Sequence, residues 1–203
     1  MSKVRSPKLS FFERVADGLL WRLRRIGVSI KPYVTVKEGE VQPDPEMLND
    51  KFVFCELTED DIDELLKLDS LYYTPKKLAG WFNEGKLCFG LRDGKRLVAK
   101  MWCDLAVVNW EPAYRELGPE EVYLFAAYSD PEYRGQNLAP TLRATCYTVL
   151  RERGRTSFYS HSDYYNLPAR RFKQKIGGIE EDLQAEVGLF NKWTRTFIIR
   201  RFR

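Results

Sequence analysis

A turn between a strand and a helix carries residue types that could bind a phosphate. Residues 121–129 are β-branched, aromatic and small, which predicts a mostly buried strand, and residues 138–153 place apolar side chains at helical spacing. The turn between them holds a cation, Arg134, and two residues that tolerate left-handed backbone, Gly135 and Asn137. The first amides of a helix have no intrahelical partner, and its dipole favours negative charge. The turn therefore predicts a site for phosphate or pyrophosphate.

Two strings in this part of the chain resemble the motifs of a known superfamily. Residues 134–139, Arg-Gly-Gln-Asn-Leu-Ala, are similar to the acyl-CoA-binding motif of the GNAT acetyltransferases, Gln/Arg-x-x-Gly-x-Gly/Ala. Asn137 stands where glycine is usual, and asparagine is enriched among non-glycine residues in left-handed backbone. Residues 166–177 are similar to the family's Asn-x-x-Ala helix that ends in Lys-x-Gly. The resemblance covers about residues 52–190.

The resemblance implies an α/β (α+β) fold. In the GNAT fold, a mixed, mostly antiparallel sheet is flanked by helices and splayed between its fourth and fifth strands, and the cofactor lies in that gap. Periodicity and turn signals in the chain predict the same order of elements. We expect strands at 52–57, 87–91, 97–108, 121–129, 157–161, 186–190 and 194–202, and helices at 58–68, 75–85, 138–153 and 166–177.

The N-terminal part differs in composition from the rest. Residues 1–50 are expected to form a basic amphipathic helix and a linker, and residues 51–203 the acyltransferase domain. The helix is extra to the GNAT fold and runs from Leu9 to Ile26, where apolar residues recur at helical spacing among basic ones. Such a helix can make a peripheral contact with an anionic membrane surface, or pack on the domain or on a second subunit of a homodimer. Residues 32–50 then indicate a linker with one short strand at 33–36.

Composition excludes several classes of protein. The 203 residues carry a net charge of +4, and the basic residues lie without any recognised nucleic-acid-binding motif, so we expect no nucleic-acid partner. A signal peptide and a membrane-length apolar run are both missing, which favours a cytoplasmic protein. With His161 as the single histidine and no Cys-x-x-Cys pair, we expect no metal and four reduced cysteines: Cys55, Cys88, Cys103 and Cys146.

The resemblance also implies a binding mode for acetyl-CoA or another acyl-CoA. Backbone groups of Ala127 and Ser129 would hold the pantetheine arm, and Asn166, whose helix includes Ala169, would fix the arm near the sulfur. An alternative for Asn166 is a helix N-cap, and it can serve as both. An alternative for Arg134 is a surface cation. The pyrophosphate is assigned to the turn formed by Arg134, Gly135, Gln136, Asn137, Leu138 and Ala139.

Acetyl transfer to an amine requires a base and a proton donor for the thiolate. Glu121 falls where the histone acetyltransferase branch keeps its glutamate base, and we expect desolvation to raise its pKa toward neutrality. The alternatives are a solvated charge at a strand start and His161 as the base. For the donor, many GNAT enzymes place a tyrosine seven residues after the asparagine, where this chain has Lys173. Tyr164, Tyr165 or water is then expected to replace it.

We interpret the chain as an N-acetyltransferase that transfers an acetyl group from acetyl-CoA to a primary amine of a small molecule or sugar. Tyr73 and Tyr114 are the candidates for walling the acceptor pocket, with packing as the alternative role of each. Two other interpretations remain open. One is an acyltransferase that uses a longer acyl chain on CoA or on a carrier protein, and the other is a module that binds acyl-CoA without turnover.

Overall fold

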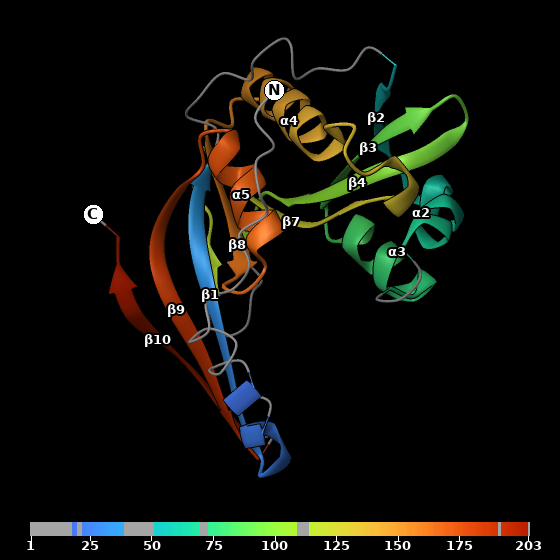
Figure 1. Cartoon of the computed structure of the whole chain (residues 1–203). Helices are drawn as coiled ribbons and strands as arrows, with labels where there is room; N and C mark the ends of the chain where they lie inside the picture. The colour runs from blue at the N-terminus through green and yellow to red at the C-terminus, as the bar shows by residue number, and fades with distance from the viewer. Residues whose placement is uncertain are drawn as a thin grey trace.

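The computed structural model describes residues 18–19, 22–38, 51–69, 73–108, 114–190 and 192–202. Most of these residues belong to one eight-stranded mixed sheet (Figure 1). Its strand order is β10-β9-β1-β8-β7-β4-β3-β2, and a separate two-stranded ribbon joins β5 and β6. The strands are β1 (Val28–Glu38), β2 (Val53–Leu57), β3 (Leu87–Asp93), β4 (Arg96–Asp104), β5 (Val107–Val108), β6 (Arg115–Glu116), β7 (Glu121–Ser129), β8 (Ser157–Asp163), β9 (Ile179–Leu189) and β10 (Trp193–Arg201).

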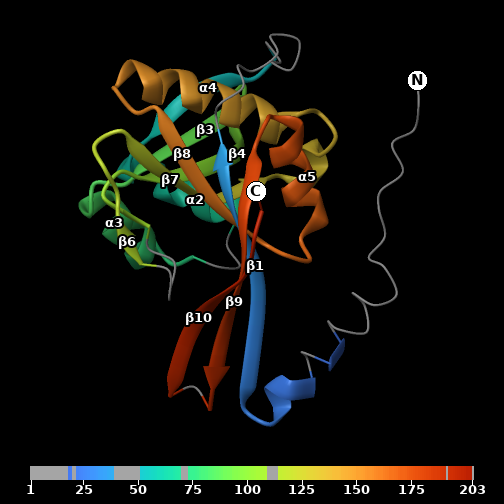
Figure 2. The same ribbon diagram turned by 90° about the vertical axis from the view of Figure 1, so that its left-hand side faces the viewer.

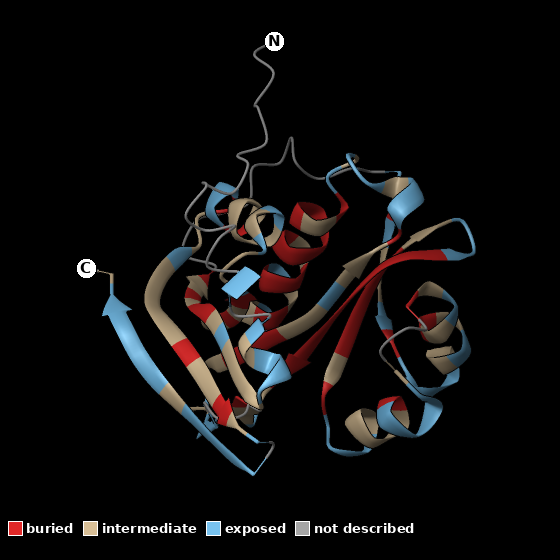
Figure 3. Cartoon of the chain, turned by 60° about the horizontal axis from the view of Figure 1, so that its bottom comes forward, coloured by how far each residue is buried: buried red, intermediate tan, exposed pale blue. Residues whose placement is uncertain are grey.

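Helices lie on both faces of the sheet. The first face packs on α4 (Leu138–Glu152) and α5 (Leu167–Lys175), and the second on α2 (Ile62–Leu68) and α3 (Pro75–Asn83) (Figure 1). Two short 3-10 turns, Glu59–Asp61 and Pro131–Tyr133, precede α2 and the turn that leads into α4. Figure 3 shows the buried residues gathered between these layers. The predicted fold class, a mixed, mostly antiparallel sheet flanked by helices, is confirmed.

Local sequence explains where α2 and α3, the helices on the second face, begin. Thr58 and Asp61 form a capping box, in which the Thr58 amide donates to Asp61 Oδ2 at 2.8 Å. Thr74 caps α3 by accepting from the Lys77 amide at 3.3 Å, and Pro75 occupies the first helical position, where its missing N–H costs nothing. The rings of Trp81 and Phe82 on α3 pack against Trp102 of β4, with ring centroids 4.9 and 4.7 Å away.

The sheet splays between β7 and β8, the fourth and fifth strands of the expected series. The parallel ladder between them runs from Glu121–Ser157 to Leu124–Ser160 and ends there. β7 continues to Ser129 alongside β4 only, while β8 continues to Asp163 alongside β1. The backbone edge of β7 after Leu124 therefore faces a gap rather than a neighbouring strand.

The first strand corrects the expected linker. The structure has an 11-residue strand at Val28–Glu38 instead of a short strand at 33–36, and this strand lies inside the sheet, antiparallel to both β8 and β9. β1 was expected to lie before the domain, which was predicted to begin at residue 51, but it pairs within the domain's sheet. Pro32 suggested that no long strand would form here, because proline lacks the N–H that a sheet ladder uses. Alternation of buried Val34, Val36 and Glu38 with Thr35 and Lys37 is the strand signal.

The ends of the chain differ in smaller ways. Most of the expected helix at 9–26 lies outside the described residues, which show helical backbone at 18–19 and 22–25. β9 is longer than the strand expected at 186–190, and the strand expected at 97–108 is divided into β4 and β5. The four cysteines are free thiols, and three of them are buried. Among the described helices, none has the length and apolar character needed to cross a membrane.

Candidate functional site

A β-bulge in β7 marks the start of the gap. Between the pairs Lys100–Tyr128 and Trp102–Phe125, β4 contributes one residue and β7 contributes two, Ala126 and Ala127. Ala126 adopts a positive φ of 49°, which is uncommon for a residue with a side chain. The bulge turns β7 away from β8 at the point where their ladder ends. Ala127, a predicted cofactor contact, is exposed there, and Ser129 lies at the end of the strand, paired with Ala99.

The turn that follows β7 has the backbone of an anion site. Gly135 and Asn137 take φ values of +83° and +57°, so asparagine does adopt the left-handed conformation expected of it. The amide of Thr141 makes the first helical bond, to the Asn137 carbonyl at 3.0 Å, and Pro140 has no N–H. The amides of Leu138 and Ala139 therefore precede the hydrogen-bond ladder of α4. The side chain of Arg134 beside them is exposed.

Asn166 begins the helix on the other side of the gap. Its side-chain oxygen accepts from the Ala169 amide at 3.2 Å, so it is an N-cap of α5, as one of its two expected roles requires. Pro168 in the first turn leaves no amide to satisfy at that position. This cap fixes the start of α5 next to the end of β8, which brings Asn166 and Ala169 to the same end of the gap as residues 161–165.

Lys173, which stands at the family's usual tyrosine position, is buried in a charge network. Its Nζ donates to Ser160 Oγ at 2.7 Å and to the carbonyl of His161 at 2.8 Å. Burial lowers its pKa to about 8, although Glu38 of β1, 3.7 Å away, opposes that shift. In this position Lys173 fixes the backbone of His161 and has only 4% of its surface exposed.

Glu38 is the centre of that network. Arg143 of α4 lies 3.5 Å from one carboxylate oxygen, and hydroxyls of Ser160 and Tyr147 also donate to the carboxylate. Burial opposes ionisation, but Arg143, Lys173 and these hydroxyls outweigh it and lower the pKa of Glu38. β1 thereby supplies the counter-charge for cations on both helices that flank the gap.

The second face of the sheet has a cavity of about 420 Å³ that reaches the bulge. Phe125 and Ala126 of β7 form one side, and Trp81 of α3 lies edge-on to Phe125 with ring centroids 5.0 Å apart. The charged lining includes a buried ion pair, Lys86 with Asp104, at 3.1 Å. The remaining lining residues are Tyr73, Lys77 and Tyr123.

Tyr123 connects this cavity with His161. The Tyr123 hydroxyl lies 3.2 Å from His161 Nδ1, and the two rings meet edge to face at 5.4 Å. Burial, together with the charges of Lys173 and Arg115, lowers the pKa of His161 to about 3, so its imidazole is neutral at pH 7. Burial also raises the pKa of Tyr123, which keeps its hydroxyl protonated. Tyr123 lines the cavity and His161 does not, so the Tyr123 hydroxyl is the member of the pair that can hydrogen-bond with a group there.

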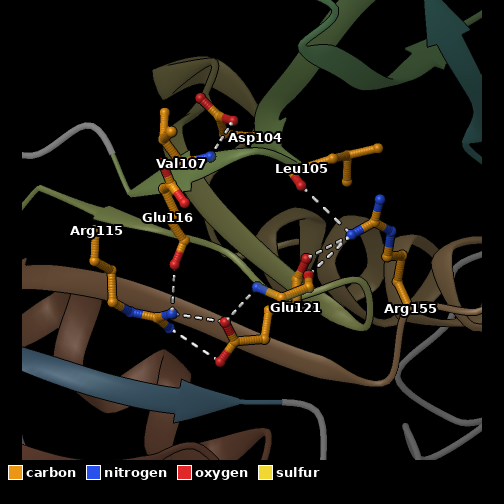
Figure 4. Close-up of polar contacts among 8 residues, drawn as sticks. Asp104, Leu105, Val107, Arg115, Glu116, Glu121 and Arg155 are labelled. Atoms are coloured by element: carbon orange, nitrogen blue, oxygen red, sulfur yellow. Dashed lines mark hydrogen bonds and ion pairs between the residues drawn. The ribbon is translucent and has the colours of Figure 1, made fainter.

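Glu121 does not have the environment expected of a base. Arg115 donates to both of its carboxylate oxygens, at 2.6 and 3.2 Å, and the Gly118 amide donates at 2.9 Å (Figure 4). The Arg115 hydrogen bonds outweigh desolvation and lower the pKa of Glu121, the opposite of the expected rise. Figure 4 also shows Arg155 donating to the carbonyls of Leu105 and Glu121. Glu121 lies where β7 and β8 are still paired and is not among the residues that line the cavity.

The other predicted residues are divided between the cavity and the surface. Tyr73 lines the cavity, where the Lys100 ammonium lies 4.2 Å from its ring centroid. Tyr114 is 62% exposed and outside the lining. Tyr165 lies in the turn before Asn166, and its amide donates to Asp163 at 2.8 Å.

Five of the residues that line the cavity were not predicted from the sequence: Tyr123, Phe125, Trp81, Lys86 and Asp104. The signal for the first two was present. Residues 121–129 alternate, with Val122 and Leu124 in the core beneath α4 and Tyr123 and Phe125 on the other face. A strand described only as mostly buried hides that division. No pattern along the chain brings Trp81 and Asp104 together with it.

Comparisons with known proteins agree with this geometry. A family model described as "Acetyltransferase (GNAT) family" matches residues 51–178. A structure from Novosphingobium aromaticivorans, described as an acetyltransferase of the GNAT family, aligns with a TM-score of 0.59 at 22% identity, over 80% of this chain and 66% of that one. The chain thus spans about two thirds of that structure. No curated protein sequence matches the chain.

Two further solved structures share the fold. The ribosomal-protein-S18-alanine N-acetyltransferase of Escherichia coli aligns with a TM-score of 0.51 at 18% identity, over 62% of this chain and 76% of that one. An aminoglycoside acetyltransferase from an uncultured soil metagenomic sample, in complex with trehalose, aligns with a TM-score of 0.51 at 13% identity, over 63% and 88%. The family model, the splayed sheet and the turn before α4 agree, and the chain belongs to the GNAT family of acetyltransferases.

Proposed function

We propose that this acetyltransferase moves the acetyl group of acetyl-CoA to a primary amine of a small molecule or sugar. One observation carries the proposal: the cavity reaches Ala126, at the bulge where β7 leaves β8. An acceptor in that cavity would meet an acyl group held along the free edge of β7. A protein with this fold that acts on aminoglycosides supports an amino sugar as one class of acceptor.

The cofactor half of the proposal rests on the turn before α4. The free amides of Leu138 and Ala139, with the helix dipole and the exposed Arg134, are suited to a pyrophosphate. The edge of β7 from Ala127 to Ser129 offers backbone groups to a pantetheine arm, as an added strand would use them. Asn166, at the start of α5, would contact the pantetheine arm from the side opposite β7.

The acceptor half rests on the chemistry of the cavity. Its volume of about 420 Å³ lies within the usual range for small-molecule sites. Aromatic faces of Tyr73, Trp81 and Phe125 suit the apolar face of a sugar or another flat ligand, and the ion pair of Lys86 with Asp104 adds polar groups to the lining.

We propose that the ammonium form of the acceptor loses its proton mainly to solvent. Glu121 is held by Arg115, and His161, with a pKa of about 3, is a weak base. We assign Tyr123 and His161 to orientation: the Tyr123 hydroxyl would bind the neutral amine so that its lone pair faces the thioester. kcat/KM should then rise with pH along the amine's own ionisation. Tyr123→Phe should lower it about tenfold, because one hydrogen bond is lost.

We propose Tyr165 as the donor of the proton that the departing thiolate takes up. It immediately precedes Asn166, which we place near the sulfur, whereas Lys173 is held inside the charge network of Glu38. A Tyr165→Phe variant that keeps its acetyl-CoA affinity but loses turnover would support this role. An unchanged kcat would assign the proton to water.

The function is tested by calorimetric titration with acetyl-CoA, followed by thiol release with a panel of small amines and amino sugars. Tyr73→Ala should raise the KM of the acceptor about tenfold at unchanged acetyl-CoA affinity, because an aromatic contact in the cavity is lost. Tyr114→Ala is the matched control, since that ring is exposed outside the cavity. Acetyl-CoA binding without thiol release for any amine would instead favour a binding module.

A further inference from the structure

The strands β1, β9 and β10 extend past the helices as a three-stranded arm. Figures 1 and 2 both show the arm reaching away from the rest of the molecule. Its end is formed by residues 22–28, which lead into β1, and by the turn at 189–193 between β9 and β10. Val28 pairs with Leu189, and Leu189 with Trp193, so the two segments lie side by side. We call these residues the arm tip.

The arm tip exposes large apolar side chains. Ile26 is 63% exposed, Phe190 67% and Trp193 40%. Phe190 adopts a positive φ of 50°, a conformation that is costly for a bulky residue. Its amide donates to the Gly27 carbonyl at 2.6 Å, so the turn is fixed to the start of β1. The structure thus maintains an unfavourable backbone conformation at a largely exposed residue whose ring lies against Gly27.

Cations surround these apolar groups. Arg22, Arg24 and Arg25 precede Ile26, Lys192 and Arg195 flank Trp193, and the Arg195 guanidinium lies 6.0 Å from the Trp193 ring centroid. Residues 22–30 and 188–195 contain no Asp or Glu. Glu186, the next acid along β9, is already paired with Lys31 at 2.7 Å. The arm tip therefore carries positive charge with no acid of its own.

We propose that the arm tip docks this protein on an anionic lipid surface. Exposed aromatic and aliphatic side chains ringed by arginine and lysine are the composition that inserts at the level of lipid headgroups. Long cationic side chains can reach the phosphates while the rings enter the acyl boundary. The proposal is independent of the acceptor and of the acetyl-transfer chemistry.

Shape and charge favour lipid over two other occupants. The arm tip is a projecting end made of two short segments, whereas a stable protein interface usually buries roughly 1,200–2,000 Å² in total. A second copy of this chain would bring a second set of the same cations against the first, which is repulsive. A fluid anionic surface needs neither a matching groove nor a fixed counter-charge.

The test is co-sedimentation of the full chain with vesicles, either of phosphatidylcholine alone or of equal parts phosphatidylcholine and phosphatidylserine. The parent should bind the anionic vesicles at low salt and lose most of that binding as salt rises above about 0.1 M, because the Debye length shortens. Replacing Lys192 and Arg195 by Gln should weaken binding about fivefold per cation. Arg200→Gln, farther along β10, should have little effect.

A double variant tests the apolar part. Phe190→Asn with Trp193→Thr removes both rings, keeps a residue that tolerates positive φ and keeps a β-former in the strand, so folding is expected to survive. It should lower vesicle binding at least tenfold. The matched control is Phe197→Thr with Ile199→Thr, which removes equally exposed apolar groups from the middle of β10 and should bind as the parent does.

Three results would overturn the proposal. The first is an absence of parental binding to anionic vesicles at low salt. The second is parental binding that the Phe190→Asn, Trp193→Thr variant retains, which would locate the contact elsewhere, for example before residue 22. The third is a dimer in sedimentation equilibrium that the same variant dissociates, which would make the arm tip a contact between copies.

Discussion

The two halves of the sheet differ in what surrounds them. β4 is buried from Leu97 to Asp104, with helices on both faces, whereas every residue of β10 is exposed except the half-buried Thr196 (Figure 3). The family model covers β2 through α5 and stops before β9, so β1, β9 and β10 lie outside it. We refer to β2, β3, β4, β7 and β8 as the shared half of the sheet, and to β1, β9 and β10 as the second half. Glu38 joins them, because it extends from β1 to cations of α4 and α5.

The largest effect should follow from cutting that connection. Glu38→Gln leaves Arg143 and Lys173 buried without their carboxylate, and breaking a buried pair costs about 3–5 kcal/mol of unfolding free energy. Urea unfolding at pH 7 measures it. Glu38 raises the pKa of Lys173, so the variant's Lys173 loses its proton below the parental pKa of about 8. The deficit should therefore shrink as pH rises toward 8 and stay constant above it, where Lys173 is neutral in both folded proteins.

Glu186→Gln is the matched control for this comparison, because it removes a glutamate of the same half of the sheet whose partner, Lys31, is about half exposed. It should cost less than about 1 kcal/mol. Equal losses in the two variants would mean that the Glu38 network does not hold the halves together.

The next largest effect is expected in the shared half of the molecule, at the turn before α4. Arg134→Glu places a carboxylate beside the turn before α4 and should lower acetyl-CoA affinity roughly a hundredfold or more, as judged by calorimetric titration. Arg200→Glu on the exposed arm makes the same change in net charge and should leave affinity as it was. Parental affinity in the folded Arg134→Glu variant would show that the turn does not bind the pyrophosphate.

A smaller effect concerns His161, where the two halves meet. Its folded pKa of about 3 is below its unfolded value, so between these values the unfolded chain binds more protons and stability falls as pH falls. The loss due to this group should approach about 1.4 kcal/mol per pH unit. Urea unfolding from pH 7 to pH 4 should show a shallower decline for His161→Gln than for the parent. Parallel curves would mean that the imidazole titrates normally in the folded protein.

The smallest effect is expected at Glu121. Glu121→Gln keeps the shape, leaves the cavity unchanged and should lower kcat by no more than about threefold, because its carboxylate serves Arg115 and the Gly118 amide. Turnover with a high-pKa alkylamine is the measurement. A loss of a hundredfold or more at parental acetyl-CoA affinity would restore Glu121 as the general base.

The shared half was the more predictable one, for physical reasons. Caps such as Thr58 and Thr74 and the left-handed Asn137 act within a few residues, so local spacing reveals them. The cavity residues were harder, because Trp81, Asp104 and Tyr123 come from three elements that only tertiary packing joins. The pKa of Glu121 was predicted with the wrong sign for the same reason: Arg115 lies in another strand.

The second half could be predicted only in fragments. Pro32 and the prolines after it indicated a linker, yet β1 accepts Pro32 opposite Ala185 and continues to Glu38. A strand that pairs with partners from the far end of the chain leaves no local mark of its place in the sheet. The buried charge of Glu38 is likewise unreadable along the sequence, because its counter-charges are on α4 and α5.

The place of β1 in the sheet has a consequence for how the chain is made. Among the described strands, β1 is synthesised first, and its neighbours β8 and β9 follow only after β2 to β7. The hairpin of β3 and β4 can close as soon as it emerges, whereas pairs such as Val28–Leu189 must wait for almost the whole chain and then close a very long loop. Until then Glu38 remains in water, and a gap between β8 and β9 is open to any other extended segment. Of the described strands, the one synthesised first therefore takes its place in the sheet only after β8 and β9 are made.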